Sequence, residues 1–283
     1  MTTPKLAVAT DRGRFYTDPN PAYDGASYPS VTNVLSTGVS KPVLVPWATK
    51  ITAERAMETV GTLMKASRDP KQREAAIKDL KAHVRHVSES AAELGSHIHD
   101  AAEKHNLGLP MGEDADVEAF ALQYLAWLDS WGVDLSTDLE AAEASVVHRD
   151  AGYAGTFDVL IWLRSGVKRA RELWLIDFKT SSTRAADSVF PEHVMQLAAL
   201  RHAQTVWLPH GLEAPMPMAD RCAVLNLRRG DHALMEVPAD RDAFDGFLGA
   251  LATTKYLHSL DIKTAVRAVP APGLAIAQRK EAA

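Results

Sequence analysis

The spacing of apolar residues along the first half of the chain is that of helices. It predicts a helix from Pro46 to about Thr59, a long helix or two abutting helices over residues 70–106, and an amphipathic helix over residues 117–131. Proline at the first turn and glycine after the last turn support these limits. Gly95 is expected to interrupt the second helix, and residues 1–27 are expected to be irregular.

After Gly132 the apolar pattern becomes that of strands, with short runs rich in β-branched and aromatic residues. Gly152 and Gly155 predict a hairpin between the first two strands, and the third strand is apolar enough to lie in the centre of a sheet. From about residue 262 the pattern has no period, which predicts a frayed end. The predicted strands cover residues 144–149, 156–163, 173–179, 221–227 and 232–237, and the predicted helices cover residues 191–207 and 239–258.

This order of elements predicts an α/β fold, with one core of strands and helices and a mostly helical N-terminal half packed against it. The 283 residues suffice for one large domain or two small ones. We therefore expect three parts. They are an irregular and helical segment over residues 1–90, a core over residues 91–260, and a flexible tail over residues 261–283.

The composition excludes several classes of protein. Apolar residues make up 46% of the chain and charged residues 24%, as in proteins with a sizeable core, so disorder throughout is excluded. The single cysteine, Cys222, is expected to be a buried thiol and excludes an internal disulfide or a cysteine-only zinc site. The sequence has no phosphate-binding loop, which excludes a motor ATPase. With no apolar run of 18 residues and no signal-peptide core, we expect a cytoplasmic protein without a membrane partner.

The net charge of −5 gives no sign of nucleic-acid binding, but the charges are unevenly placed. Between Lys65 and Arg85 there are seven lysines or arginines and three acids, whereas the stretch from His105 to His148 has no lysine or arginine. A second basic cluster spans residues 164–171. Such runs fit either solvated surfaces with an exposed hairpin or two basic patches that flank a site for a polyanion.

Three short strings hold the candidate catalytic residues: Gly95-Ser-His-Ile-His99, Gly155-Thr-Phe-Asp158 and Asp177-Phe-Lys179. In a strand, Asp177 and Lys179 point to one face while Phe178 points to the other. The pair is either a simple salt bridge at the edge of a strand or part of a divalent-metal site. In the second case the lysine positions the attacking water.

One carboxylate holds a hard cation poorly, so a metal site needs further ligands. Asp158 is the candidate for a second carboxylate, and Gly155 is expected to give the backbone the freedom to bring it close. His99 is the candidate for a third ligand, because His97 lies about 200° away on the same helix. Glu103, one turn after His99, either orients the imidazole or pairs with another residue at the surface.

With these strings in this order and Gln196-Leu-Ala-Ala-Leu200 after them, the chain resembles the PD-(D/E)XK nucleases of the RecB-like group, which includes phage recombination exonucleases. The likeness covers roughly residues 90–230, and residues 28–60 further resemble the N-terminal segment of phage and prophage members. It implies a restriction-endonuclease-like core, in which helices flank a central mixed sheet. The chain departs from the family in having Leu200 where tyrosine is usual.

The resemblance also implies a role for each candidate residue. Lys179 is the catalytic lysine, and Gln196 contacts DNA or orients the catalytic groups. Glu143 either assists the metal site or is a plain acid at the edge of a strand. Some relatives hold an iron–sulfur cluster with four cysteines, and we expect no such cluster here. The implied ligands of Mg²⁺ or Mn²⁺ are His99, Asp158, Asp177 and the carbonyl of Phe178.

The function that the resemblance implies is a metal-dependent DNA nuclease, above all an exonuclease that processes or recombines phage or prophage DNA. Two alternatives stay open: a catalytically silent nucleic-acid-binding module on the same fold, and a helical adaptor, which leaves the strands unexplained. By analogy with phage recombination systems, a homo-oligomer and a single-strand annealing protein are further partners, although no sequence feature specifies an interface. The expected contacts to DNA phosphates are Lys71, Arg73, Lys78, Lys81, Arg164, Lys168 and Arg169.

Overall fold

The computed structural model describes residues 6–112, 114–166, 170–208 and 212–269. Its centre is a mixed seven-stranded sheet in the order β10-β9-β6-β5-β4-β7-β8, in which only β6 and β9 run parallel. The α/β fold expected from the order of elements is confirmed. The strands are β4 (Leu139–His148), β5 (Tyr153–Ser165), β6 (Ala170–Thr180), β7 (Thr205–Trp207), β8 (Glu213–Pro215), β9 (Arg221–Leu227) and β10 (His232–Glu236).

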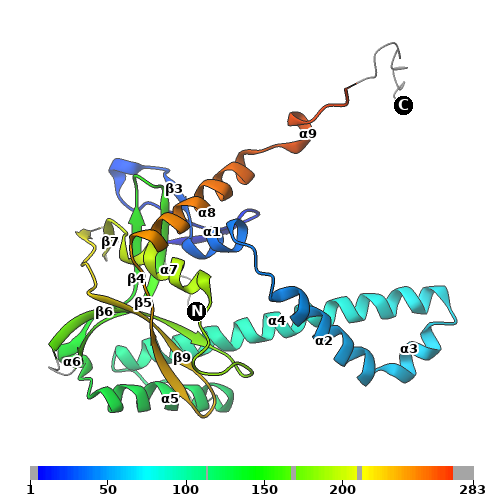
Figure 1. Ribbon diagram of the computed structural model, residues 1–283, viewed down its shortest axis with the longest axis horizontal. Coiled ribbons are helices and arrows are strands. Elements are labelled where there is room, and N and C mark those ends of the chain that lie inside the picture. The colour runs from blue at the N-terminus through cyan, green and yellow to red at the C-terminus, as the bar shows by residue number, and fades with distance from the viewer. Residues whose placement is uncertain (1–5, 113, 167–169, 209–211, 270–283) are drawn as a thin grey trace.

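Helices cover both faces of this sheet (Figure 1). The alternation along β6 shows why, because Leu173 and Leu175 pack into one apolar layer while Trp174 and Ile176 pack into the other. The short helix α6 (Leu135–Asp138) leads into β4. One layer contains α1 (Val31–Gly38), α7 (Pro191–Arg201) and α8 (Arg241–Ser259), and the other contains α5 (Ala115–Trp131) and the C-terminal half of α4 (Pro70–Asn106).

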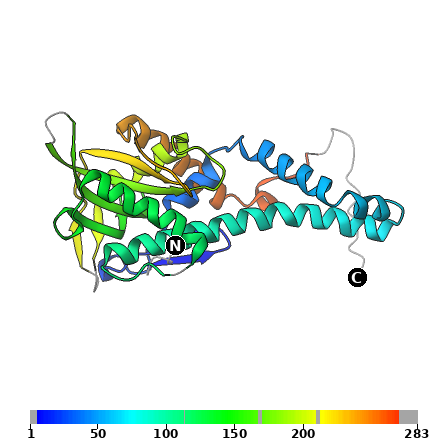
Figure 2. The ribbon, with the colours of Figure 1, turned by 90° about the horizontal axis from the view of Figure 1, so that it is seen from below.

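A helical arm projects from this body (Figure 2). It consists of α2 (Leu44–Glu58), α3 (Val60–Ala66) and the N-terminal half of α4. Helix α4 has 37 residues and is about 56 Å long, so one half lies against the sheet while the other half extends away from it. The boundary expected at residue 90 falls inside this helix. Residues 7–38 belong to the body, because β2 and β3 contact β5 and α1 contacts α8.

The described part of the first 27 residues contains strands, so the expectation of an irregular segment is wrong. The strands β1 (Ala7–Thr10) and β2 (Gly13–Thr17) form a hairpin, and β3 (Ser27–Pro29) pairs with β2. Gly13, with a φ of +100°, makes the tight turn of the hairpin. Tyr16 is fully buried, and its burial ties the small sheet to the body. Strands this short carry too few residues for a period of two to stand out.

Three further features of the helices and strands differ from the predictions: the expected break in α4, the start of β4 and the end of α7. Helix α4 continues through Gly95 without a break, and the glycine allows close approach to β6, since a Cβ there would lie 3.2 Å from Oγ1 of Thr180. Strand β4 begins earlier than predicted because pairing with β5 outweighs the helix propensity of the alanines and glutamates in Leu139–Glu143. Helix α7 is shorter than predicted because Thr205–Trp207 pairs with β4 as β7.

The end of the chain differs from the expected frayed tail, whereas the single cysteine lies where it is expected. A short helix, α9 (Ile262–Ala265), forms where a frayed end is predicted, and residues 270–283 of the predicted tail lie outside the described residues. Cys222 is buried in the sheet, as expected, and burial raises the pKa of its thiol to about 12. Among the described residues, no helix combines the length and the apolar character needed to cross a membrane.

We expect Gly38→Ala to destabilise the protein by about 1–3 kcal/mol. Helix α1 meets α8 at this glycine, and an added Cβ would lie 2.5 Å from the carbonyl oxygen of Ala250, a backbone atom that cannot rotate away. Urea or thermal unfolding measures the change. Gly61→Ala in α3 is the control, because nothing lies within 4 Å of its Cβ, and it should keep or raise stability by up to about 1 kcal/mol. Equal stabilities of the two variants would contradict the close contact.

Candidate functional site

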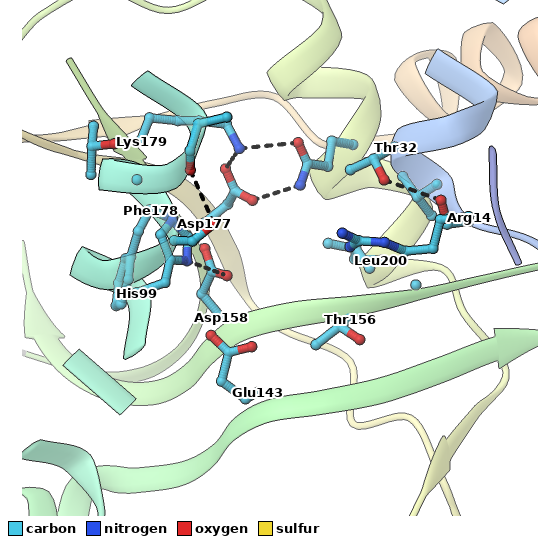
Figure 3. A pocket seen from close by; sticks show the side chains of 18 of the residues that line it. Arg14, Thr32, His99, Glu143, Thr156, Asp158, Asp177, Phe178, Lys179 and Leu200 are labelled. Carbon is cyan, nitrogen blue, oxygen red and sulfur yellow. Dashed lines mark hydrogen bonds and ion pairs between the residues drawn. The ribbon is translucent and has the colours of Figure 1, made fainter. Parts of the chain in front are cut away.

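A cavity of about 440 Å³ opens where α4 and α7 meet the middle of the sheet (Figure 3). Candidate residues from all three sequence strings line it: His99 comes from α4, Asp158 from β5, and Asp177 and Lys179 from β6. Gln196 reaches the same cavity from α7. The fold therefore brings together side chains that are up to 97 positions apart in the sequence, from His99 to Gln196 (196 − 99).

Strand β4 changes face at this cavity. Ala142 and Ala144 are two positions apart and would share a face in a regular strand, but they pack into opposite apolar layers. Between them Glu143 has a φ of +48°, in the left-handed region that residues other than glycine seldom adopt. From this residue onward, the side chains of the strand therefore point to the opposite faces from those that a regular alternation would give. The carboxylate of Glu143 itself lines the cavity.

Strand β5 makes the same change opposite Glu143. Phe157 and Val159, which flank Asp158, also pack into opposite layers. The ladder between β5 and β6 ends at Val159, and beyond it Oδ2 of Asp158 accepts a hydrogen bond from the backbone N–H of Phe178. The irregularity places two carboxylates, Glu143 and Asp158, side by side, and backbone strain of this kind is concentrated at functional sites.

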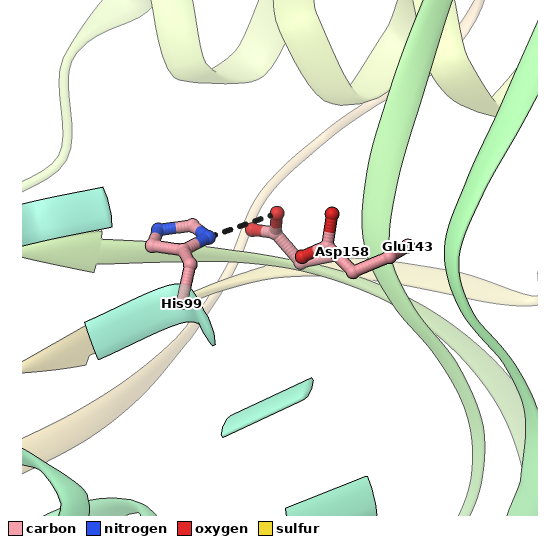
Figure 4. Close-up of side chains that lie close together, drawn as sticks. All are labelled: His99, Glu143 and Asp158. Carbon is pink, nitrogen blue, oxygen red and sulfur yellow. Dashed lines mark ion pairs between the residues drawn. The ribbon is translucent and has the colours of Figure 1, made fainter. Parts of the chain in front are cut away.

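His99, Glu143 and Asp158 offer ligand atoms that all lie within 4.8 Å of one another (Figure 4). Nδ1 of His99 lies 3.2 Å from Oδ1 of Asp158 in an ion-pair contact. This buried nitrogen has no aligned hydrogen-bond partner among the described residues. Two carboxylates and an unsatisfied imidazole nitrogen suit a divalent cation, so the residues present fit the Mg²⁺ or Mn²⁺ that the resemblance implies.

Burial and neighbouring charges set the protonation of this cluster. Burial, reinforced by the carboxylate of Asp158, raises the pKa of Glu143 to about 8, so Glu143 is mostly neutral at pH 7. Burial alone would lower the pKa of His99, but Asp158 and Glu143 outweigh it and the pKa is raised. For Asp158 the opposing charges of His99 and Lys179 outweigh burial, and the pKa is lowered. A bound cation would take over the role of the proton on Glu143.

Asp177, Lys179 and Gln196 form a second group beside the first. Nζ of Lys179 forms an ion pair with Asp177 and donates a hydrogen bond to Oε1 of Gln196 over 3.2 Å. Nε2 of Gln196 donates to Oδ1 of Asp177 over 2.6 Å. Burial raises the pKa of Asp177 although Lys179 opposes the rise. As a metal ligand, Asp177 would exchange one of these contacts for the ion.

Phe178 lies between the two groups. Its ring points away from Asp177 and Lys179, as the period of two predicts, and packs 5.8 Å from the ring of His99 and 5.3 Å from that of Tyr124 (distances between ring centres). Its backbone N–H holds Asp158, so one peptide joins the carboxylates of β5 and β6. The metal-ligand role of its carbonyl stays a prediction.

Arg228, at the end of β9, fixes the chain just after Lys179. Its guanidinium is buried and donates hydrogen bonds to the carbonyl oxygens of Lys179 (3.0 Å), Arg184 (2.8 Å) and Ala185 (3.0 Å). These bonds tie the end of β6 to the loop that leads into α7, and so hold Lys179 in register with Gln196. In the sequence, nothing distinguishes this arginine from its neighbour Arg229.

The N-terminal strands and α1 supply a wall of the cavity that the residue patterns do not predict. Arg14 and Tyr16 come from β2, and Ser30 and Thr32 come from the start of α1. The hydroxyl of Tyr16 lies 2.9 Å from Oγ1 of Thr156 on β5, which joins this wall to the sheet. The likeness stated for residues 28–60 covers Ser30 and Thr32, and no sequence signal covers Arg14 and Tyr16.

Gly155 serves packing, and the expectation that it frees the backbone is wrong. Its φ is not in the positive region, and a Cβ at this position would lie 2.8 Å from Leu200 and 3.0 Å from Val31. The missing side chain therefore lets α1 and α7 approach β5 beside the cavity. Leu200, at the position where the resembled family usually has tyrosine, fills this contact.

The two other candidates on α4 lie where the helical period puts them. His97 is exposed, whereas His99 reaches the cavity. Glu103 lies one turn beyond His99, and its charge contributes to the raised pKa of Glu143. Its role toward the imidazole stays a prediction.

The basic residues predicted to contact DNA fall into two regions. Arg164 lies six positions along β5 from Asp158, about 20 Å away, and forms an ion pair of 3.6 Å with Asp138, so the structure does not bring it to the cavity. Lys168 and Arg169 lie outside the described residues. The other four of these basic residues are exposed on the N-terminal half of α4, namely Lys71, Arg73, Lys78 and Lys81.

Comparisons with known proteins add little to this geometry. No family model matches the chain, and a search of curated proteins finds no match. Sixteen chains of solved structures match. One of them, titled "Crystal structure of SSO0001", shares 16% sequence identity with a TM-score of 0.32, over 76% of this chain and 86% of that chain. A likeness this weak carries no argument about fold or function.

We expect the metal-free protein to lose stability as the pH rises from about 5 to 8, and Glu143→Gln to remove part of this loss. The pKa of Glu143 is about 8 in the folded state, against an ordinary value of 4.5 for glutamate, so the folded state binds the extra proton between these values. One extra proton bound by the folded state lowers the free energy of unfolding by up to about 1.4 kcal/mol for each unit by which the pH rises. Thermal unfolding in EDTA measures it. The exposed control Glu118→Gln should follow wild type, and parallel curves for all three proteins would contradict the assignment.

Proposed function

We propose that the protein is a metal-dependent deoxyribonuclease of the PD-(D/E)XK type, RecB-like, and that it acts as an exonuclease in the recombination or processing of phage or prophage DNA. The observation that carries the proposal is the meeting of two groups in one cavity. His99, Glu143 and Asp158 form the first, and Asp177 and Lys179 belong to the second. Hydrolysis of a phosphodiester suits such a pair, because it needs a caged cation and a positive group near the attacking water.

The arrangement of elements supports a restriction-endonuclease-like core. The adjacent strands β5 and β6 form the hairpin at the middle of the sheet, and their ladder ends at the pair Val159 and Ile176, just before Asp158 and Asp177. Helix α4 covers one face and supplies His99, while α7 covers the other face. This is the order of helix, strand, strand and helix on which the resemblance to RecB-like nucleases rests.

Each residue of the cavity has a distinct part in the proposed reaction. His99, Glu143 and Asp158 would hold a Mg²⁺ or Mn²⁺ ion, which would supply Lewis-acid chemistry that polarises the phosphate and lowers the pKa of the attacking water. Lys179 presents its ammonium, whose side chain is 28% exposed, to negative charge that develops on the phosphate. Gln196 fixes the direction of that ammonium through its amide oxygen.

We expect cleavage of linear duplex DNA to require Mg²⁺ or Mn²⁺ and to stop in excess EDTA, while Ca²⁺ permits binding without turnover. Asp158→Asn and Glu143→Gln should lower the rate by about 100-fold or more, because each removes a charge from the cation cage. Assays on linear, nicked and circular DNA measure cleavage and separate exonuclease from endonuclease action. The exposed variant Glu118→Gln should keep the wild-type rate. Full activity in EDTA would contradict the proposal. Tight DNA binding without cleavage in any metal would instead favour a catalytically silent nucleic-acid-binding module.

We expect Lys179→Ala to retain DNA binding but to lose about 10²–10³-fold in kcat, because the ammonium interacts more strongly with the transition state than with the ground state. If Lys179 only neutralises Asp177 across their ion pair, its loss would instead act on folding or metal affinity. Single-turnover cleavage at rising Mg²⁺ decides between the two roles. Lys104→Ala, an exposed lysine on α4, is the matched control. A rate that returns to wild type at saturating Mg²⁺ would remove Lys179 from the chemistry.

A further inference from the structure

We infer that helix α4 carries a basic track for duplex DNA, formed by Lys78, Lys81 and Arg85, which leads from the cavity onto the helical arm. This inference rests on the proposed nuclease function and assigns its substrate contact. From the sequence we expect phosphate contacts within the basic run over residues 65–85, but the sequence does not show which members of the run share a face with the site. The members expected to contact phosphates are Lys71, Arg73, Lys78 and Lys81. The structure makes the selection, because His99 and the basic residues belong to one unbroken helix.

The selection follows from the angular positions of the side chains around α4. At 100° per residue, Lys81 lies five full turns before His99 and points in the same direction, to within about 10°. Arg85 and Lys78 lie about 40° and 60° away from that direction. Between them and His99, the side of the helix that lines the cavity is built from small residues, Ala92 and Ser96 among them. Apart from His99, the part of α4 that lines the cavity therefore presents only small side chains to a ligand.

The track is open to solvent and its charge is not neutralised within the described chain. Lys78, Lys81 and Arg85 are all exposed, and no ion pair joins any of them to a described acid. Helix α2 covers a different side of α4, since Arg55 of α2 contacts Asp79, which points about 160° away from the direction of His99.

Two of the three acids on this part of α4 point well away from the track, and the third, Glu89, lies at its edge, about 20° from the direction of Lys78. Between Lys78 and His99 the helix carries three acids, Asp79, Glu89 and Glu93. They point about 80–160° away from the direction of His99. A row of three exposed cations that leads toward a cavity suited to a metal ion complements a phosphate backbone.

The chemistry of the track favours duplex over single-stranded DNA. Proteins that bind single strands stack bases on aromatic side chains, and these contacts carry much of the affinity. Helix α4 contains no Phe, Tyr or Trp in its 37 residues. A row of lysine and arginine without stacking partners reads the backbone alone, and a duplex presents that backbone as a regular, rigid line of charge.

The length of the track sets the length of DNA that it can use. Arg85, Lys81 and Lys78 precede His99 by 14, 18 and 21 positions, which correspond to about 21, 27 and 32 Å along the helix. At 3.4 Å per phosphate along one strand, these residues reach phosphates about 6–9 base pairs from the cavity. Duplexes shorter than this engage the cavity and miss the track.

The test compares charge reversal on and off the track. The double variant Lys81→Glu with Arg85→Glu should raise the Kd for a labelled 20-base-pair duplex at least about 10-fold in Ca²⁺ buffer, measured by fluorescence anisotropy, and should reduce the slope of log K against log salt by about 2. Lys104→Glu is the matched control, since it is exposed on the same helix, nearer to His99, but points about 140° away. It should change Kd less than 2-fold. Circular dichroism confirms folding, and the milder pair Lys81→Gln with Arg85→Gln repeats the test.

A series of duplex lengths separates the track from a general charge effect. The double variant and wild type should bind a DNA hairpin with a 4-base-pair stem alike and should diverge once the duplex exceeds about 6 base pairs. Equal Kd values for wild type and variant on long duplexes would overturn the track while leaving the nuclease proposal intact if DNA is still cut. Tighter binding of single strands than of duplexes by wild type would also overturn it. Duplex binding that depends on Lys81 and Arg85, without cleavage in any metal, would keep the track and end the nuclease proposal.

Discussion

Two half-buried carboxylates that lie side by side are the constraint on which the rest of the site depends. Glu143 and Asp158 face each other where β4 and β5 both change face, and the pKa of Glu143 rises because burial and the charge of Asp158 outweigh the opposing charge of His99. Such a pair persists only if a proton, His99 or a bound cation offsets the repulsion. The left-handed backbone at Glu143 is therefore a local cost that the surrounding sheet supports, as is usual where the strain serves a site.

The second group of the cavity, Asp177 and Lys179 on β6, is held in place by hydrogen bonds from residues outside β6. Lys179 and Asp177 are neighbours by the period of β6, but Gln196 of α7 decides how they are directed, and Arg228 fixes the backbone just behind them. A buried polar group without a hydrogen-bond partner destabilises the folded protein. This network therefore favours the one arrangement of the cavity wall in which these polar groups are paired. The two groups meet through one peptide, the N–H of Phe178 on Asp158.

Helix α4 connects the chemistry to the outer surface of the protein. Its C-terminal half packs under the sheet through Ile98 and Ala102, and this packing orients His99, while its N-terminal half extends into the arm. A straight helix keeps its angular relations over its whole length. The face that lines the cavity is therefore continued on the arm, and one rigid element relates the position of the site to the position of the exposed basic residues.

The sequence by itself determined the longer helices and strands and most of the candidate residues, because strand and helix periods are local properties. The period of two placed Asp177 and Lys179 together, the helical period chose His99 over His97, and the order of elements predicted the α/β fold. Only the tertiary structure decided what meets across strands and layers. It brought Glu143 into the cluster through a backbone turn that no propensity encodes, added Arg14 and Tyr16 from a hairpin too short to show a period, and gave Gly155 a packing role. These outcomes depend on contacts between distant parts of the chain, whose energies exceed the weak local preferences of the residues involved.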